Sequence, residues 1–131
     1  MEDLPKLISY HKVVPFEGKL IGINEKENLG LFTIKRIYWI KYSAKEVTQS
    51  EHAHKSLRQI IIAVDGEINI TLTSPEGKEQ HFTLNDPTQG LYIPPLYWKK
   101  IEYAKPCTLL CLASESFSES DYIRNYEDFK K

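Results

Sequence analysis

Two runs in the middle of the chain decide its fold class: Gln59-Ile-Ile-Ile-Ala-Val64 and Glu67-Ile-Asn-Ile-Thr-Leu-Thr73, with the pair Asp65-Gly66 between them. Both runs are rich in β-branched residues, and the second alternates apolar and polar side chains with the period of two that is typical of a strand. Asp-Gly between two apolar runs is a strong short-range signal for a β-hairpin. The centre of the chain therefore predicts two antiparallel strands joined by a tight turn.

Similar short runs flank this centre on both sides. Strands are expected over 20–23, 32–40 and 51–54 before it, and over 80–84, 91–93, 98–103 and 108–113 after it. The loop 74–78 contains Pro75 and Gly77 and predicts a second hairpin. Many short strands with turn signals between them are typical of a sandwich or barrel, so we expect an all-β fold, a small antiparallel barrel of roughly nine strands.

The C-terminal stretch 118–129 has a different period. Its apolar residues recur at helical spacing: Tyr122, Ile123, Tyr126 and Phe129. Ser118 or Ser120 is a suitable N-cap, and acidic residues follow in the first turn. A short C-terminal helix is therefore expected here, with its apolar side against the barrel.

Composition narrows the class of protein. The chain has 131 residues, 41% of them hydrophobic, which suits a single domain over residues 1–131. Seventeen basic and eighteen acidic residues leave a net charge of −1, so the basic footprint of a nucleic-acid binder is missing. No uninterrupted apolar run in residues 1–20 resembles a signal peptide or a spanning helix. We expect a cytoplasmic protein that binds neither nucleic acid nor membrane.

His52-Ala53-His54 is the segment that carries the most chemistry. Residues two apart on a strand point to the same side, so both imidazoles meet one space. That space is either the interior of the barrel or a polar outer surface. The strand leads into the apolar run that begins at Gln59, which favours the interior. Because the unperturbed pKa of imidazole lies close to neutrality, such a pair indicates acid–base chemistry.

Arg36 and Tyr38 are the best partners for the histidine pair. With Ile34 and Ile40 they share one face of their predicted strand, which puts a guanidinium beside a phenol. Alternation alone leaves open whether this face is interior or on the outer surface. The two cysteines, Cys107 and Cys111, lie four apart on one strand, too far to bridge, and are expected to be buried free thiols.

The chain resembles a known family, the cupin-type 3,4-oxoisomerases that act on dTDP-4-oxo-6-deoxyglucose, also called WxcM-like proteins. The resemblance runs through Thr33-Ile-Lys-Arg-Ile-Tyr38, His52-Ala-His-Lys55 with Leu57 and Gln59, the Asp65-Gly66 turn, Thr83-Leu-Asn-Asp-Pro87, Gly90-Leu-Tyr-Ile93 with Trp98, and Leu112-Ala-Ser114 leading to Asp121-Tyr-Ile-Arg-Asn-Tyr126. It implies a small cupin (jelly-roll) barrel, a homodimer, and a dTDP-4-keto-6-deoxyhexose of deoxysugar biosynthesis as the ligand.

The same resemblance assigns roles to the residues of the site. It implies that His54 is the base that removes the proton beside the ketone through an enediolate, and that His52 and Tyr38 hold, relay or donate protons. The residues expected to bind the substrate are Arg36, Gln59, Lys99 and Glu17.

No metal and no other cofactor is expected. Metal-binding cupins follow their His-x-His with a Glu and add a His from a later strand, and this chain has Gln59 and Lys99 at those places. An ammonium does not bind a cation, and two imidazoles alone leave a first-row metal under-coordinated.

Three positions depart from the usual pattern of the family. Glu17 stands where an arginine is usual, Gln49-Ser50 stands where Arg-Gly is usual, and Lys99 stands where a histidine is usual. These departures leave two other hypotheses open: a module that binds a nucleotide sugar without catalysis, and a related sugar-nucleotide epimerase.

Overall fold

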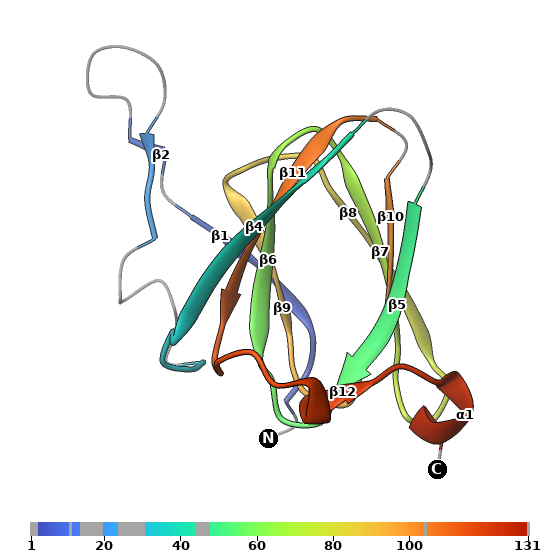
Figure 1. The fold of residues 1–131 in the computed structure, drawn as a ribbon. Helices are drawn as coiled ribbons and strands as arrows, with labels where there is room; N and C mark the ends of the chain where they lie inside the picture. Colours follow the sequence, from blue (N-terminus) through green and yellow to red (C-terminus); the bar gives the residue numbers. More distant parts are fainter. Residues whose placement is uncertain are drawn as a thin grey trace.

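The computed structural model describes residues 3–10, 12–13, 20–23, 31–43, 48–103 and 105–130. Its strands form two five-stranded antiparallel sheets that face each other (Figure 1). The first sheet has the order β1 (Lys6–Ser9), β9 (Gln89–Ile93), β6 (Gln59–Asp65), β11 (Cys107–Ala113), β4 (Arg36–Tyr42). The second has the order β12 (Tyr122–Ile123), β5 (Thr48–His54), β10 (Trp98–Tyr103), β7 (Ile68–Thr73), β8 (Glu79–Leu84). A separate pair consists of β2 (Lys12–Val13) and β3 (Leu20–Ile21).

The all-β, jelly-roll fold class is confirmed, with one correction to the expected barrel. Within the described ranges, β4 pairs only with β11 and β5 pairs only with β10 and β12. No ladder therefore joins the two sheets at this side, and the fold is an open sandwich. The short strands β1 and β2 were not expected from the sequence.

The main hydrophobic core lies between the two sheets. On β6, Ile61 and Ala63 point into this core, whereas Ile60 and Ile62 join a second cluster on the outer face of the first sheet. Alternation alone would leave one face of β6 in water, but here both faces are covered, which explains why the run is continuously apolar. The apolar run from Gln59 to Ala63 is thus a central strand buried on both faces.

The two predicted hairpins have different outcomes. The loop after Thr73 does join paired strands, since β7 and β8 are adjacent and antiparallel. Asp65-Gly66 does not, because β6 and β7 belong to different sheets. Gly66 has a positive φ of 73°, and an added Cβ there would lie 2.6 Å from the Cβ of Cys107. The Asp-Gly pair makes a tight turn as predicted, but the turn carries the chain from one sheet to the other.

The predicted C-terminal helix begins later than expected. The chain first makes a single 3-10 turn at Glu119–Asp121, then adds β12 to the edge of β5, and only then forms the helix α1 (Tyr126–Phe129). Asn125, not a serine, caps this helix by accepting a hydrogen bond from the backbone of Glu127 at 2.8 Å. Phe129 packs with Trp98 on the outer face of the second sheet. No helix in the described part of the chain is long and apolar enough to cross a membrane.

Candidate active site

Strand β5 turns both histidines of the His-Ala-His segment to the interior. Ala53, between them, is buried on the outer face of the sheet in a cluster with Trp98 and Phe129. Because side chains alternate along a strand, His52 and His54 point to the other side, into the space between the sheets. His54 is buried and His52 is half-buried. Of the two placements that the sequence left open, the structure has the interior one.

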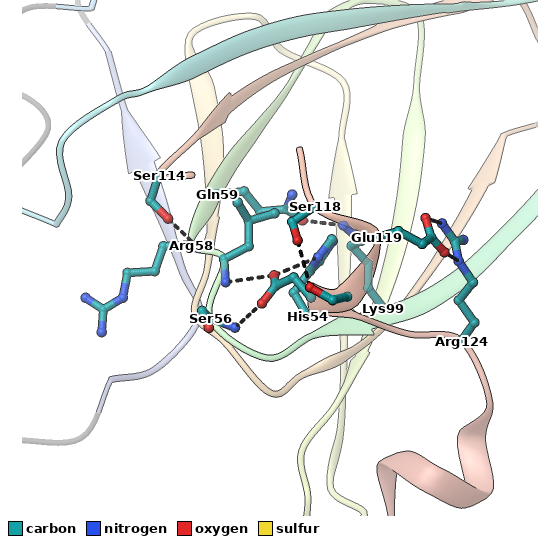
Figure 2. A network of polar contacts seen from close by, with 12 residues as sticks. His54, Ser56, Arg58, Gln59, Lys99, Ser114, Ser118, Glu119 and Arg124 are labelled. Carbon is teal, nitrogen blue, oxygen red and sulfur yellow. Dashed lines mark hydrogen bonds and ion pairs between the residues drawn. The ribbon is translucent and has the colours of Figure 1, made fainter. Parts of the chain in front are cut away.

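Tyr122 of β12 lies against both imidazoles. It pairs with His54 across the β12–β5 ladder, and its ring centroid is 4.4 Å from that of His54 and 5.2 Å from that of His52. The two imidazoles meet edge to face with centroids 4.9 Å apart. The guanidinium of Arg124 lies 4.1 Å from the centre of the Tyr122 ring. It also donates two hydrogen bonds to the carboxylate of Glu119 (Figure 2).

Asp121 fastens this segment to the end of β5. Its Oδ1 accepts a hydrogen bond from the backbone N–H of Ser56 at 2.9 Å, and its Oδ2 accepts one from Leu57 at 3.2 Å. Its backbone carbonyl accepts a third from Lys55 at 2.9 Å. Oδ2 also lies 3.4 Å from Nδ1 of His54. A carboxylate held by backbone donors therefore stands beside one imidazole.

Lys99 of β10 is a buried cation next to the histidines. It pairs with His52 across the β10–β5 ladder and is 2% exposed. Its ammonium donates to the side-chain oxygen of Gln59 on the opposite sheet (Figure 2). The Gln59 amide nitrogen lies 3.5 Å from Sγ of Cys111, and both of these side chains are buried. One chain of polar contacts thus connects the two sheets.

Strand β4 brings Tyr38 and Arg36 to the wall opposite the histidines. Tyr38 pairs with Cys111 across the β4–β11 ladder. The guanidinium of Arg36 lies 4.5 Å from the centre of the Tyr38 ring and 5.4 Å from that of Phe117. The expected neighbours Arg36 and Tyr38 are therefore adjacent. Ile34, which was expected on the same face, precedes the strand and packs in the outer cluster.

Burial and charge keep both histidines neutral. Loss of water is the main cause and the ammonium of Lys99 the next: together they lower the pKa of His52 to about 2 and that of His54 to about 4. Asp121 acts in the opposite sense on the pKa of His54. Burial also lowers the pKa of Lys99 to about 8, which leaves it mostly protonated at pH 7. At neutral pH the site therefore holds two imidazoles able to accept a proton beside one positive charge.

The opposite wall responds to burial in the other direction. Burial raises the pKa of the Tyr38 hydroxyl and that of the Cys111 thiol above their ordinary values. Both groups keep their protons at neutral pH, so they can donate hydrogen bonds but cannot serve as bases.

A series of contacts that passes through Cys111 connects six of the seven predicted site residues: His52, His54, Tyr38, Arg36, Gln59 and Lys99. Glu17 lies outside the described residues, as does the side chain of Gln49. Sequence reasoning missed Asp121, Tyr122 and the contact of Cys111. The segment from Asp121 is part of the family resemblance, but the sequence predicts a helix there and not the strand β12 that pairs with β5.

The described residues offer no group of three His, Cys, Asp or Glu side chains arranged to hold a metal ion. Gln59 and Lys99, which stand where metal-binding cupins have a Glu and a His ligand, bind each other: the ammonium of Lys99 donates a hydrogen bond to Gln59. The expectation of a metal-free protein stays a prediction.

Fold and contacts together define a cupin-type protein that holds two neighbouring histidines between its two sheets. The chain belongs to the family described as FdtA: WxcM-like, C-terminal, whose family model matches residues 3–131.

Relatives of known activity are similar over nearly their whole length. A TDP-4-oxo-6-deoxy-alpha-D-glucose-3,4-oxoisomerase from Aneurinibacillus thermoaerophilus is 36% identical over 128 residues, which cover 96% of this chain and 90% of that protein. A mutant of a 3,4-ketoisomerase from Thermoanaerobacterium thermosaccharolyticum, solved in complex with TDP-4-keto-6-deoxyglucose, is 37% identical, with a TM-score of 0.87 and coverage of 99% and 94% of the two chains. A TDP-quinovose 3,4-ketoisomerase from Campylobacter jejuni is 32% identical, with a TM-score of 0.85 and coverage of 96% of both chains.

Proposed function

We propose that this protein is a TDP-sugar 3,4-ketoisomerase that acts on a TDP-4-keto-6-deoxyhexose. The observation that carries the proposal is the pair of neutral imidazoles, His52 and His54, held inside the sandwich of a chain from this family. The activities of relatives that align over nearly the full length name the substrate class.

The reaction needs one base and a site that stabilises negative charge. A hydrogen on carbon 3 is acidic because the neighbouring ketone at carbon 4 delocalises the charge that its removal creates. Loss of this proton gives an enediolate. Protonation at carbon 4, with the hydroxyl proton shifting from the oxygen on carbon 3 to that on carbon 4, leaves the ketone at carbon 3. Every atom is conserved, so the reaction requires only proton transfers.

His54 is the base in this proposal. It is neutral at pH 7 because its pKa is lowered, and it stands between Tyr122 and a carboxylate that favours its protonated form. A group with these properties takes up a proton during the reaction and releases it again in the same cycle.

The other predicted residues act around this proton transfer. His52, whose ring contacts that of His54, relays or orients protons. Tyr38 keeps its proton and donates it as a hydrogen bond to a sugar oxygen. The positive charges of Arg36 and Lys99 stabilise the negative charge of the enediolate or of the diphosphate. Gln59 fixes the position of the Lys99 ammonium by accepting its hydrogen bond.

Incubation of the protein with TDP-4-keto-6-deoxyglucose, followed by NMR of the sugar ring protons, tests the proposal. A 3-keto product is expected. Binding without conversion would instead identify a nucleotide-sugar-binding module, and inversion at carbon 5 would identify an epimerase.

We also propose that the protein is a cytoplasmic homodimer. In support of a dimer, β4 lies at the edge of its sheet, and its outward side chains Ile37 and Trp39 are 56% and 66% exposed. Apolar side chains on an open edge strand favour contact with a second chain. Light scattering at micromolar concentration should give twice the mass of the chain, and Trp39→Lys should lower it. A wild-type monomer contradicts the proposal.

A further inference from the structure

We infer that Asp121 is a positioning residue for His54, which fixes the imidazole with its proton on Nδ1 and its lone pair on Nε2. The inference rests on the proposed role of His54 as the base, and it assigns a function to a residue of the C-terminal segment.

The first argument is the way in which the carboxylate is held. The side chain of Asp121 is 18% exposed, and each of its oxygens accepts a backbone N–H from the turn that follows β5. Since that turn continues directly from His54, the carboxylate and the imidazole belong to one small unit. A third backbone hydrogen bond, from the Lys55 N–H to the Asp121 carbonyl, also joins the two segments. Asp121 therefore cannot shift without moving the backbone next to His54.

The second argument is the environment of Nδ1. This atom is buried, and among the described residues no hydrogen bond of ordinary geometry reaches it. The group that faces it is Oδ2 of Asp121 at 3.4 Å. Hydrogen bonds of catalytic groups are often long without substrate and shorten when it binds. A buried nitrogen beside an anchored carboxylate is therefore a contact poised to form.

The third argument is chemical. An ionised carboxylate only accepts hydrogen bonds, whereas a neutral imidazole has one nitrogen that donates and one that accepts. Facing Asp121, Nδ1 must be the donor, so Nε2 is left as the acceptor that can take a proton from the substrate. Once Nε2 is protonated, the carboxylate stabilises the imidazolium. An aspartate that orients a catalytic histidine in this way need not gain a proton itself.

Other charged and titratable groups lie near His54, and some of them affect how readily its imidazole takes up a proton. Lys99 on β10 and Arg124 after β12 both disfavour a positive imidazole, and His52 on the same strand adds its ring. Tyr122 contributes its aromatic ring, whose centroid is 4.4 Å from that of His54. Among these neighbours Asp121 is the one that favours the imidazolium.

The experiment compares wild type with Asp121→Asn, using Asp128→Asn as the matched control. Asp128 lies in the same C-terminal segment, is exposed, and touches none of these groups through its carboxylate. Nitrogen-15 NMR of the four histidines, with the His54 signals assigned by their loss in His54→Asn, reports the tautomer. Steady-state kinetics with TDP-4-keto-6-deoxyglucose and calorimetry with TDP report catalysis and binding.

In wild type, His54 is expected as the Nδ1–H tautomer. Asp121→Asn presents an amide that can donate to Nδ1, so the Nε2–H tautomer should gain population. kcat should fall roughly 10-fold to 10³-fold, with KM and TDP affinity within about threefold of wild type. Because the carboxylate raises the pKa of His54, the acidic limb of the remaining activity should move to lower pH. Asp128→Asn should match wild type throughout.

A wild-type His54 found as the Nε2–H tautomer overturns the inference, and this readout needs neither turnover nor a folded Asp121→Asn protein. So does an Asp121→Asn protein with wild-type kcat and tautomer. Failure of the proposed function has a different signature, since a protein that does not isomerise the sugar still reports the tautomer of His54.

Discussion

The two walls of the site are built from similar ladders, yet burial affects their titratable groups in opposite ways. On the wall formed by β5 and β12, the pKa of both imidazoles is lowered, and the two groups are free bases at pH 7. On the wall formed by β4, β6 and β11, the pKa of Tyr38 and that of Cys111 are raised, and both groups stay protonated. Burial disfavours whichever form is charged, so the same physical cause makes bases of one wall and donors of the other.

This difference restricts where a proton can be taken up. In the proposed mechanism the base for the sugar carbon comes from the β5 wall, because Tyr38 and Cys111 of the opposite wall stay protonated at pH 7. Lys99 spans the two walls, since it lies beside His52 and binds Gln59. Its charge acts on the imidazoles without being neutralised by a carboxylate in the contacts described. Four substitutions or treatments separate these roles.

The largest effect is expected for His54→Asn. Loss of the base should lower turnover by roughly 10²-fold to 10⁴-fold, because a proton-transfer group acts in the transition state. TDP affinity should stay close to that of wild type, since in the proposed site other side chains hold the nucleotide. NMR of the sugar protons measures the first quantity and calorimetry the second.

His52→Asn should have a milder effect, a fall in turnover of roughly tenfold, if this residue only relays or orients protons. Its more strongly lowered pKa makes it the weaker base of the pair. The same two measurements apply. A loss of turnover as large as that of His54→Asn would contradict the proposal that His54 is the base and that His52 only relays or orients protons.

Lys99→Met is expected to change the pH profile more than the rate at pH 7. Removing the ammonium removes a cause that lowers the pKa of both histidines, so these values should rise toward 6.5. The base is active only when neutral, and the acidic limb of kcat against pH should therefore move to higher pH. An unmoved limb in a variant that still binds TDP would show that Lys99 does not act on the histidines.

The smallest effect, none at all, is expected from removing metal ions. Gln59 and Lys99 stand where a metal site of this fold would need ligands, and they bind each other. Dialysis against EDTA should leave turnover unchanged, and elemental analysis should find no stoichiometric transition metal. About one metal per chain, lost in His52→Asn, would overturn this prediction.

The sequence predicted strands well and connections less well. Runs such as 98–103 matched a strand because alternation and β-branched residues report the local surface on which a strand packs. Asp65-Gly66 failed as a hairpin because turn chemistry fixes only a local φ, which Gly66 does adopt, and not the sheet that the next strand joins. Which ladders form depends on pairings between distant parts of the chain, and no short window of sequence contains them.

In the site too, local patterns were predicted and contacts between distant parts of the chain were not. Spacing of two predicted that His52 and His54 share one face, as do Arg36 and Tyr38, and the structure has the members of each pair in contact. Asp121 and Tyr122 were missed as site residues because their apolar and acidic neighbours fit a helix, whereas pairing with β5 made Tyr122 a strand residue. A hydrogen bond from Ser56 to Asp121 joins residues that are 65 positions apart, which only the folded chain reveals.

The proposed role of His54 is tested most directly by following the hydrogen on carbon 3 of TDP-4-keto-6-deoxyglucose by NMR, with wild-type and His54→Asn protein at saturating substrate. Wild type should remove this hydrogen, whether it then reaches carbon 4 or the solvent. His54→Asn should remove it at least about 10²-fold more slowly while still binding the nucleotide. Removal by His54→Asn at the wild-type rate would contradict the account, because some other group would then be the base.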